Sequence, residues 1–229
     1  KPWYQWEDSL KCFYRDNSAI SFHTTYEEVQ FYCFVQYLFH IQWEKLRDYA
    51  HKKGISIIGD VPIYVPYDSV DVWSNPKWFC LDETMTPTAV AGCPPDGFNA
   101  DGQLWGNPLY RWDLLKEDGY RWWIQRLKAA AMRYDIIRID HFRAFAGYYA
   151  VPYGAENART GEWMTGPGMD FVRAVQEALP KISLIAEDLG FLTEDVHALR
   201  DESGWPGMKV LEFAFDGNPE NPYLPYNHT

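Results

Sequence analysis

The 229-residue sequence is long enough for one barrel or for one to two smaller domains, with room for a large core. Hydrophobic residues make up 47% and charged residues 23%, as in ordinary globular proteins. The net charge is −11 and no basic run is present. We therefore expect no nucleic-acid partner and no anionic membrane partner, because both require a positively charged surface.

Aromatic residues are abundant: 11 Trp, 16 Tyr and 13 Phe make up 17% of the chain. Flat ring faces suit the stacking of sugars, although such residues also fill helix faces and loops. The four cysteines are dispersed without metal-ligand spacing, as is typical of a reducing cytoplasm. No apolar stretch approaches the ~20 residues of a membrane span. The sequence predicts a cytoplasmic location, and its start at Lys1 and stop at Thr229 suggest a segment of a longer polypeptide.

A long helix is predicted after the irregular, aromatic-rich residues 1–23. Thr24 and Glu27 have the spacing of a capping box. Apolar residues at helical intervals then continue to Tyr49, and the helix is expected to stop at Gly54.

A buried strand is predicted next, over the apolar run 55–61. Residues 62–113 follow as a long excursion rich in Pro, Gly, Asn and Trp, without a sustained period. Loops of that length are usually functional or disordered, and the aromatic content argues against disorder.

The second half of the chain alternates helices and strands. We predict helices over 114–133 and 169–179, and a further helix that begins after Thr193 and ends at Gly204. Residues 147–168 are interpreted as an irregular loop. The strands predicted in this half are 134–143, 182–186 and 209–215.

Four βα-type units in succession favour a (β/α) barrel or a doubly wound sheet. Four strands are too few to close an eight-stranded barrel. The expected fold class is therefore α/β, the central part of a (β/α)₈ TIM barrel with long inserted loops and with strands missing at both ends. Residues 1–229 would form one partial catalytic domain.

Two successive predicted strands end in carboxylates, Asp140 and Glu187. Reactive groups lie at the carboxyl ends of strands in such folds, and neighbouring strands are about 4.8 Å apart. A retaining glycosidase needs two carboxyl groups about 5 to 5.5 Å apart, one as nucleophile and one as acid and then base. Arg138 and Asp140 are two positions apart on the predicted strand, so both side chains point to the same face. A positively charged arginine beside a carboxylate nucleophile keeps that carboxylate ionised. Asp140 is the candidate nucleophile.

A structural interpretation fits the same residues. Polar side chains commonly end strands, with Arg138 and His141 as their structural partners, and spacing alone does not decide between the two. Asp60, at the end of the first strand, is open to both interpretations: contact with substrate, or hydrogen bonds to backbone at the mouth of the barrel. His141 and Asp188 are assigned structural roles first and ligand roles second.

The excursion adds groups that suit a sugar site. Paired donors and acceptors match sugar hydroxyls, and aromatic faces permit stacking, although Pro- and Gly-rich aromatic loops also pack on domain surfaces. The polar candidates are Asp96, Gln103 and Asn107, and the aromatic candidates are Phe98 and Trp105.

Seven segments in a fixed order, from near Gln36 to the end, point to one family. They are GDVPIY (59–64), DVWSNP (71–76), PPD (94–96), GQLWGNPLYRW (102–112), RIDHFR (138–143), IAEDLG (185–190) and PGMKVL (206–211). On these segments the sequence resembles the 4-alpha-glucanotransferases, also called amylomaltases or disproportionating enzymes, which are relatives of the α-amylases.

The resemblance implies a (β/α)₈ barrel that cuts an α-1,4-glucosidic bond, holds the glucan on Asp140 and passes it to an acceptor sugar such as glucose. Glu187 would be the acid and base, and Arg138 would hold Asp140. The loop residues Asp96, Phe98, Gln103 and Trp105 would line donor and acceptor subsites. No metal and no organic cofactor is expected.

The sequence departs from the family pattern at Gly97, where an aromatic residue is common, and at Ala144, where glycine is common. The family's third carboxylate, in a His-Asp-Asn motif, is expected shortly after Thr229. The alternatives are a non-catalytic glucan-binding fragment, an α-amylase-like hydrolase, and a fragment that associates through unpaired strand edges at 55–61 and 209–215.

Overall fold

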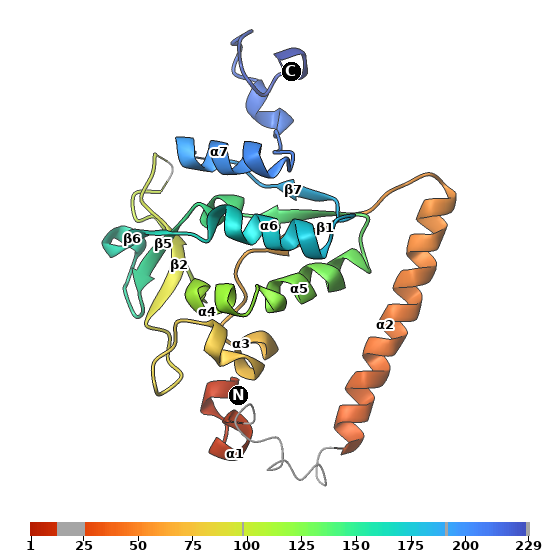
Figure 1. Cartoon of the computed structure of the whole chain (residues 1–229), viewed down its shortest axis with the longest axis vertical. Coiled ribbons are helices and arrows are strands. Elements are labelled where there is room, and N and C mark those ends of the chain that lie inside the picture. Colours follow the sequence, from red (N-terminus) through yellow and green to blue (C-terminus); the bar gives the residue numbers. More distant parts are fainter. Residues whose placement is uncertain (13–25, 98, 191, 228–229) are drawn as a thin grey trace.

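The structure is a computed structural model that describes residues 1–12, 26–97, 99–190 and 192–227. A three-stranded parallel sheet with the order β1-β4-β7 forms its centre (Figure 1). Three of the predicted strands are thereby confirmed. They are β1 (Ile58–Pro62), β4 (Ile136–Asp140) and β7 (Leu184–Ala186).

Helices cover this sheet and share its core (Figure 1). They are α5 (Arg121–Ala131), α6 (Gly168–Ala178) and α7 (Glu194–Ser203). Apolar residues four apart lie on one face of a helix, and here those faces meet the β-branched residues of β4. The residues buried together are Trp123, Leu127, Ile137, Ile139, Phe171 and Val175.

The helix predicted over 114–133 is two helices. The first is α4 (Trp112–Glu117), and α5 follows after a break. Gly119 and Tyr120 have φ angles of 65° and 54°, in the left-handed region. Glycine adopts this conformation without steric cost, so the chain turns there and the helical hydrogen bonds stop. The helix ending at Gly204, by contrast, is confirmed by the left-handed cap of that residue.

A four-stranded antiparallel sheet, order β3-β2-β5-β6, corrects two predictions. Part of the excursion 62–113 and part of the loop 147–168 pair with each other, although both were expected to be irregular. The excursion also contains α3 (Val70–Ser74) and the 3₁₀ helix η4 (Pro76–Trp78). The four strands are β2 (Ala89–Cys93), β3 (Gln103–Pro108), β5 (Gly147–Pro152) and β6 (Glu162–Thr165).

The strand predicted over 209–215 is wrong. Its centre is a 3₁₀ helix, η7 (Leu211–Ala214), and Phe213 and Phe215 are 56% and 76% exposed. An apolar run forms a strand only where its backbone pairs with a neighbouring strand, and residues 209–215 pair with no strand in the described part of the chain.

The N-terminal part contains η1 (Trp3–Gln5), α1 (Asp8–Lys11) and the long α2 (Tyr26–Lys52). The predicted capping box involves Thr24, which lies outside the described residues. Gly54 stops α2 as expected, with a φ of 72°. None of the described helices, α2 included, has the length and apolar character that crossing a membrane requires.

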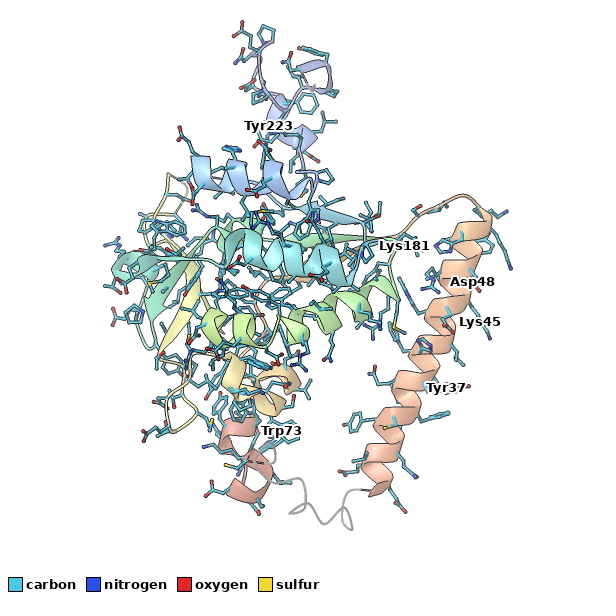
Figure 2. All side chains as sticks on the ribbon, viewed as in Figure 1. Tyr37, Lys45, Asp48, Trp73, Lys181 and Tyr223 are labelled. Carbon is cyan, nitrogen blue, oxygen red and sulfur yellow. The ribbon has the colours of Figure 1, made fainter. Side chains whose placement is uncertain are left out.

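Helix α2 stands apart from the rest of the molecule (Figure 1). It touches the body near its C-terminal end, where the indole N–H of Trp43 donates to the carbonyl oxygen of Arg133 at 3.1 Å. Large apolar side chains along α2, such as Phe31 and Phe34, are exposed. Tyr37 is exposed as well (Figure 2). The remaining short 3₁₀ helices are η5 (Phe142–Phe145), η6 (Ala158–Thr160) and η8 (Pro225–Asn227).

Candidate active site

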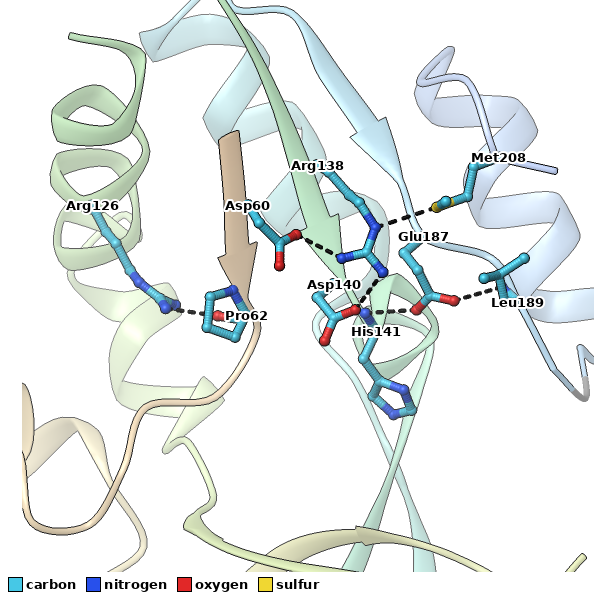
Figure 3. Close-up of polar contacts among 9 residues, drawn as sticks. All are labelled: Asp60, Pro62, Arg126, Arg138, Asp140, His141, Glu187, Leu189 and Met208. Atoms are coloured by element: carbon cyan, nitrogen blue, oxygen red, sulfur yellow. Dashed lines mark hydrogen bonds and ion pairs between the residues drawn. The ribbon is translucent and has the colours of Figure 1, made fainter. Parts of the chain in front are cut away.

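Arg138 connects two carboxylates, that of Asp140 at the end of β4 and that of Asp60, which lies in the middle of β1 and not at its end as expected (Figure 3). Its Nη2 donates to Asp140 Oδ1 at 2.7 Å, and its Nη1 donates to Asp60 Oδ1 at 2.6 Å. Asp60 and Arg138 are register partners on neighbouring strands, so both side chains leave the sheet on the same face. The expected side-by-side placement of Arg138 and Asp140 is confirmed.

Glu187 follows β7 and is only 9% exposed. Its Oε2 accepts the backbone N–H of His141, and its Oε1 accepts that of Leu189, each at 2.8 Å. Burial raises the pKa of Glu187 above its ordinary value, although these two N–H groups act in the opposite direction. The negative charge of Asp140 adds a smaller increase to this pKa. The protonated form of Glu187 is therefore favoured relative to an exposed glutamate.

His141 turns the chain at the end of β4 with a φ of 57°. Histidine is one of the residues found more often than most in this left-handed region. The turn aims its backbone N–H at Glu187, so β4 and β7 are coupled through the site. Burial and, to a smaller extent, the charge of Arg143 lower the pKa of His141 to about 4. The imidazole is therefore neutral at pH 7.

A cleft of about 650 Å³ opens between Glu187 and the antiparallel sheet. Trp105 of β3 stands edge-on to the His141 ring with centroids 4.7 Å apart, and its indole N–H donates to Gln103 Oε1 at 3.0 Å. The antiparallel sheet thus supplies one wall of the cleft and the parallel sheet the other. Lining residues include Asp96, Gln103, Trp105, His141, Arg143, Trp163 and Glu187.

The structure does not bring every predicted residue into this cleft. Asp96 lines it and also closes a turn, since its Oδ1 accepts the N–H of Asn99 at 2.7 Å. Asn107 lies on β3 but is not among the lining residues. Phe98 lies outside the described residues. Asp140, 42% exposed, lies beside the cleft at the strand end that precedes His141.

Asp60 lines a different hollow of about 530 Å³, between β1 and α5, which does not reach Glu187. Arg126 of α5 closes off the end of β1 there, because its Nη2 donates to the carbonyl oxygen of Pro62 at 2.6 Å (Figure 3). The contact of Asp60 with the site is therefore its ion pair with Arg138.

Two residues that bring a charge or an aromatic ring to the cleft, Arg143 and Trp163, are not predicted by the sequence. The guanidinium of Arg143 lies over the ring of Trp163 in β6, with its Cζ atom 4.0 Å from the centroid of that ring. Arg143 belongs to the RIDHFR segment, but its spacing alone indicates no role. Trp163 carried no local signal, because β6 reaches the cleft only through its pairing with β5.

Comparison with known proteins shows the family of the chain. The family described as 4-alpha-glucanotransferase matches residues 1–229. The chain belongs to this family. It is 47% identical to the 4-alpha-glucanotransferase of Clostridium butyricum and 47% identical to that of Thermus thermophilus, with 99% of the chain covered in each case.

Solved structures give the same result. An amylomaltase from Streptococcus agalactiae in complex with acarbose superposes with a TM-score of 0.91 at 40% identity over 100% of the chain. An amylomaltase from Corynebacterium glutamicum, 24% identical with a TM-score of 0.70 over 93% of the chain, shares the fold. These matches confirm the predicted fold class, the central part of a (β/α)₈ barrel.

The chain spans about half the length of the relatives that it matches. It covers 47% of the Clostridium butyricum 4-alpha-glucanotransferase, 45% of the Thermus thermophilus protein and 47% of the Streptococcus agalactiae amylomaltase.

Proposed function

We propose that these residues form part of the catalytic barrel of a retaining α-1,4-glucan transferase. It would move a maltooligosaccharide from one glucan to an acceptor sugar such as glucose. The observation that carries the proposal is the pairing of Asp140, held by Arg138, with a buried Glu187 whose pKa is raised. These are the environments that a nucleophile and an acid need on neighbouring strands.

The reaction divides into two displacements. Glu187 donates its proton to the glycosidic oxygen while a carboxylate oxygen of Asp140 attacks C1, so the C1–O bond breaks and a glucan ester forms. Glu187, now ionised, then removes a proton from the 4-hydroxyl of an acceptor sugar, whose oxygen attacks C1 and releases Asp140. The hydrogen bond from Arg138 disperses the negative charge of Asp140 in the free enzyme.

The cleft beside Glu187 supports a sugar ligand. Trp105 offers a partly exposed ring, and Gln103 and Asp96 offer polar atoms at the same wall. We assign substrate contacts to these residues and to His141, while Asp60 acts through Arg138. For Phe98 a substrate contact stays a prediction from the sequence, and for Asn107 the cleft gives no support. The acarbose complex of the Streptococcus agalactiae amylomaltase supports an oligosaccharide as the ligand of this cleft. Maltodextrins, starch or glycogen in the cytoplasm would supply such glucans.

Incubation of the complete gene product with maltotriose tests the proposal. Transfer yields free glucose together with glucans longer than maltotriose, whereas hydrolysis yields only maltose and glucose. The second outcome would assign the protein to the α-amylase-like hydrolases. Binding of maltotriose without any product would instead support a glucan-binding protein.

A further inference from the structure

Asp188 is a buried charge that the two displacements do not use. It is 5% exposed, its Oδ2 accepts from Arg200 Nη1 at 2.7 Å, and its Oδ1 accepts the backbone N–H of Met208 at 2.8 Å. Removing a carboxylate from water is costly, so such a group persists where charge-assisted hydrogen bonds offset the cost. One of these two bonds fixes the main chain at Met208.

The segment 206–208 is fastened to β7 at a second point. The N–H of Ala186, in β7, donates to the carbonyl oxygen of Pro206 at 2.8 Å. The approach of Asp188 is so close that a Cβ at Gly207 would lie 2.3 Å from its Oδ2. Only glycine fits at this position without displacing the carboxylate. The position of Met208 relative to the sheet is therefore set by two contacts, the Asp188 carboxylate on its own N–H and the backbone hydrogen bond of Ala186 with Pro206.

Met208 reaches Arg138 from this position (Figure 3). Its sulfur accepts a hydrogen bond from Arg138 Nε at 3.3 Å. The guanidinium is planar and rigid, so fixing its Nε edge also fixes the direction in which Nη2 points. Nη2 is the atom that donates to Asp140. A chain of contacts thus runs from Arg200 through Asp188, Met208 and Arg138 to the proposed nucleophile.

We propose that Asp188 and Met208 are positioning residues for Asp140. The Asp188 carboxylate anchors the main chain of Met208, and the Met208 sulfur holds the Nε edge of Arg138 so that Nη2 faces Asp140. This inference rests on the proposed function, because Asp140 acts as the nucleophile only there. Asp60, which is 57% exposed, supports the same guanidinium from the opposite side through Nη1.

Asp188→Asn in the complete gene product tests the anchor. The amide cannot satisfy both Arg200 and the N–H of Met208 as a carboxylate does. We expect kcat for maltotriose transfer to fall roughly 10- to 100-fold with KM within about twofold, since misplaced reacting groups lower kcat. Asp201→Asn is the matched control, because Asp201 is the other partner of Arg200, is 67% exposed and has no link to Met208. Equal activity of the two variants would overturn the proposal.

Met208→Leu tests the contact between the Met208 sulfur and Arg138 Nε. Leucine keeps a similar apolar volume, so this variant remains informative even if Asp188→Asn folds poorly. When Met208→Leu is the only substitution, so that Arg138 is present, we expect a similar fall in kcat. In an Arg138→Lys background, which lacks the Nε–H donor, Met208→Leu should have no further effect. If Met208 had only a structural role, Met208→Leu would lower kcat by the same factor in the wild type and in Arg138→Lys. Such additive losses would overturn the proposal.

A readout without activity separates the two proposals. In the ¹⁵N spectrum of the wild-type protein, the Nε–H of Arg138 should exchange slowly with solvent. Its exchange should accelerate at least about tenfold in Asp188→Asn and in Met208→Leu, and not in Asp201→Asn. If maltotriose is not converted by the wild type but the exchange follows this pattern, the proposed function fails and the positioning of Arg138 stands. Unchanged exchange in both variants would overturn the positioning role.

Discussion

Asp140 and Arg138 lie two positions apart on the same strand, and their direct contact is what gives Asp140 its proposed role. Asp140→Asn replaces the attacking oxygen with an amide, which is a poor nucleophile. We expect maltotriose transfer to fall by roughly 10³-fold or more, measured as glucose release by the complete gene product. Asp101→Asn is the control, because it removes a charge from another Arg–Asp pair, with Arg159, that is exposed. A near-normal rate in Asp140→Asn would contradict the assignment.

Glu187 leads to a prediction about pH. Because burial raises its pKa, the acid form persists to higher pH than in an exposed glutamate, and formation of the glucan ester should slow as pH rises through that pKa. Glu187→Gln cannot titrate. We expect its rate to be roughly 10²- to 10⁴-fold lower and its alkaline limb to be lost, with the smallest effect on substrates with good leaving groups. Rate measurements on maltotriose and on an aryl maltoside across pH check this, and an unchanged alkaline limb would refute it.

At the scale of single residues, part of the site could be predicted from local pattern. Arg138 and Asp140 share a face because strand side chains alternate, and this needs no knowledge of the rest of the chain. Met208 and Trp163 could not be placed in this way. Their contacts with Arg138 and Arg143 depend on where a loop and an edge strand lie in three dimensions.

Among the elements, the buried parallel strands were predictable and the antiparallel sheet was not. Short apolar runs in the sequence identify β1, β4 and β7, whereas β2 and β5 are recognisable only once they pair with each other across a long stretch of chain. The same dependence on a partner explains the wrong strand at 209–215, which is rich in apolar residues but pairs with no strand among the described residues.

The join between β2 and β3 carries a prediction for the cleft wall. A Cβ at Gly92 would lie 2.3 Å from the carbonyl oxygen of Gln103, so Gly92→Ala must push the two strands apart. We expect a loss of about 1–3 kcal/mol of stability, measured by urea unfolding, together with weaker maltotriose binding as Gln103 and Trp105 shift. Gly97→Ala is the matched control for stability, because a Cβ there meets nothing within 4 Å. Equal urea midpoints for the two variants would count against this packing.

For the whole molecule, the described chain exposes surfaces that isolated proteins usually cover. β1 and β7 are the two edges of the parallel sheet, and α2 carries exposed Phe31, Phe34 and Tyr37. Unpaired edges and large apolar patches promote association. We expect the isolated 229-residue polypeptide to sediment as species larger than a monomer, increasingly so at higher concentration. A compact monomer at all concentrations would show that these surfaces do not associate.

The two reacting carboxylates come from different strands, and this affects how the enzyme responds to heating. Asp140 and its arginine are spaced by the covalent chain of β4, whereas Glu187 arrives from β7 and is tied to β4 by hydrogen bonds such as that from the His141 N–H. Thermal loosening between the strands therefore disturbs proton delivery before it disturbs the nucleophile. On mild heating, the rate on ordinary glucans should therefore fall before the rate on glycosides whose leaving groups need no proton.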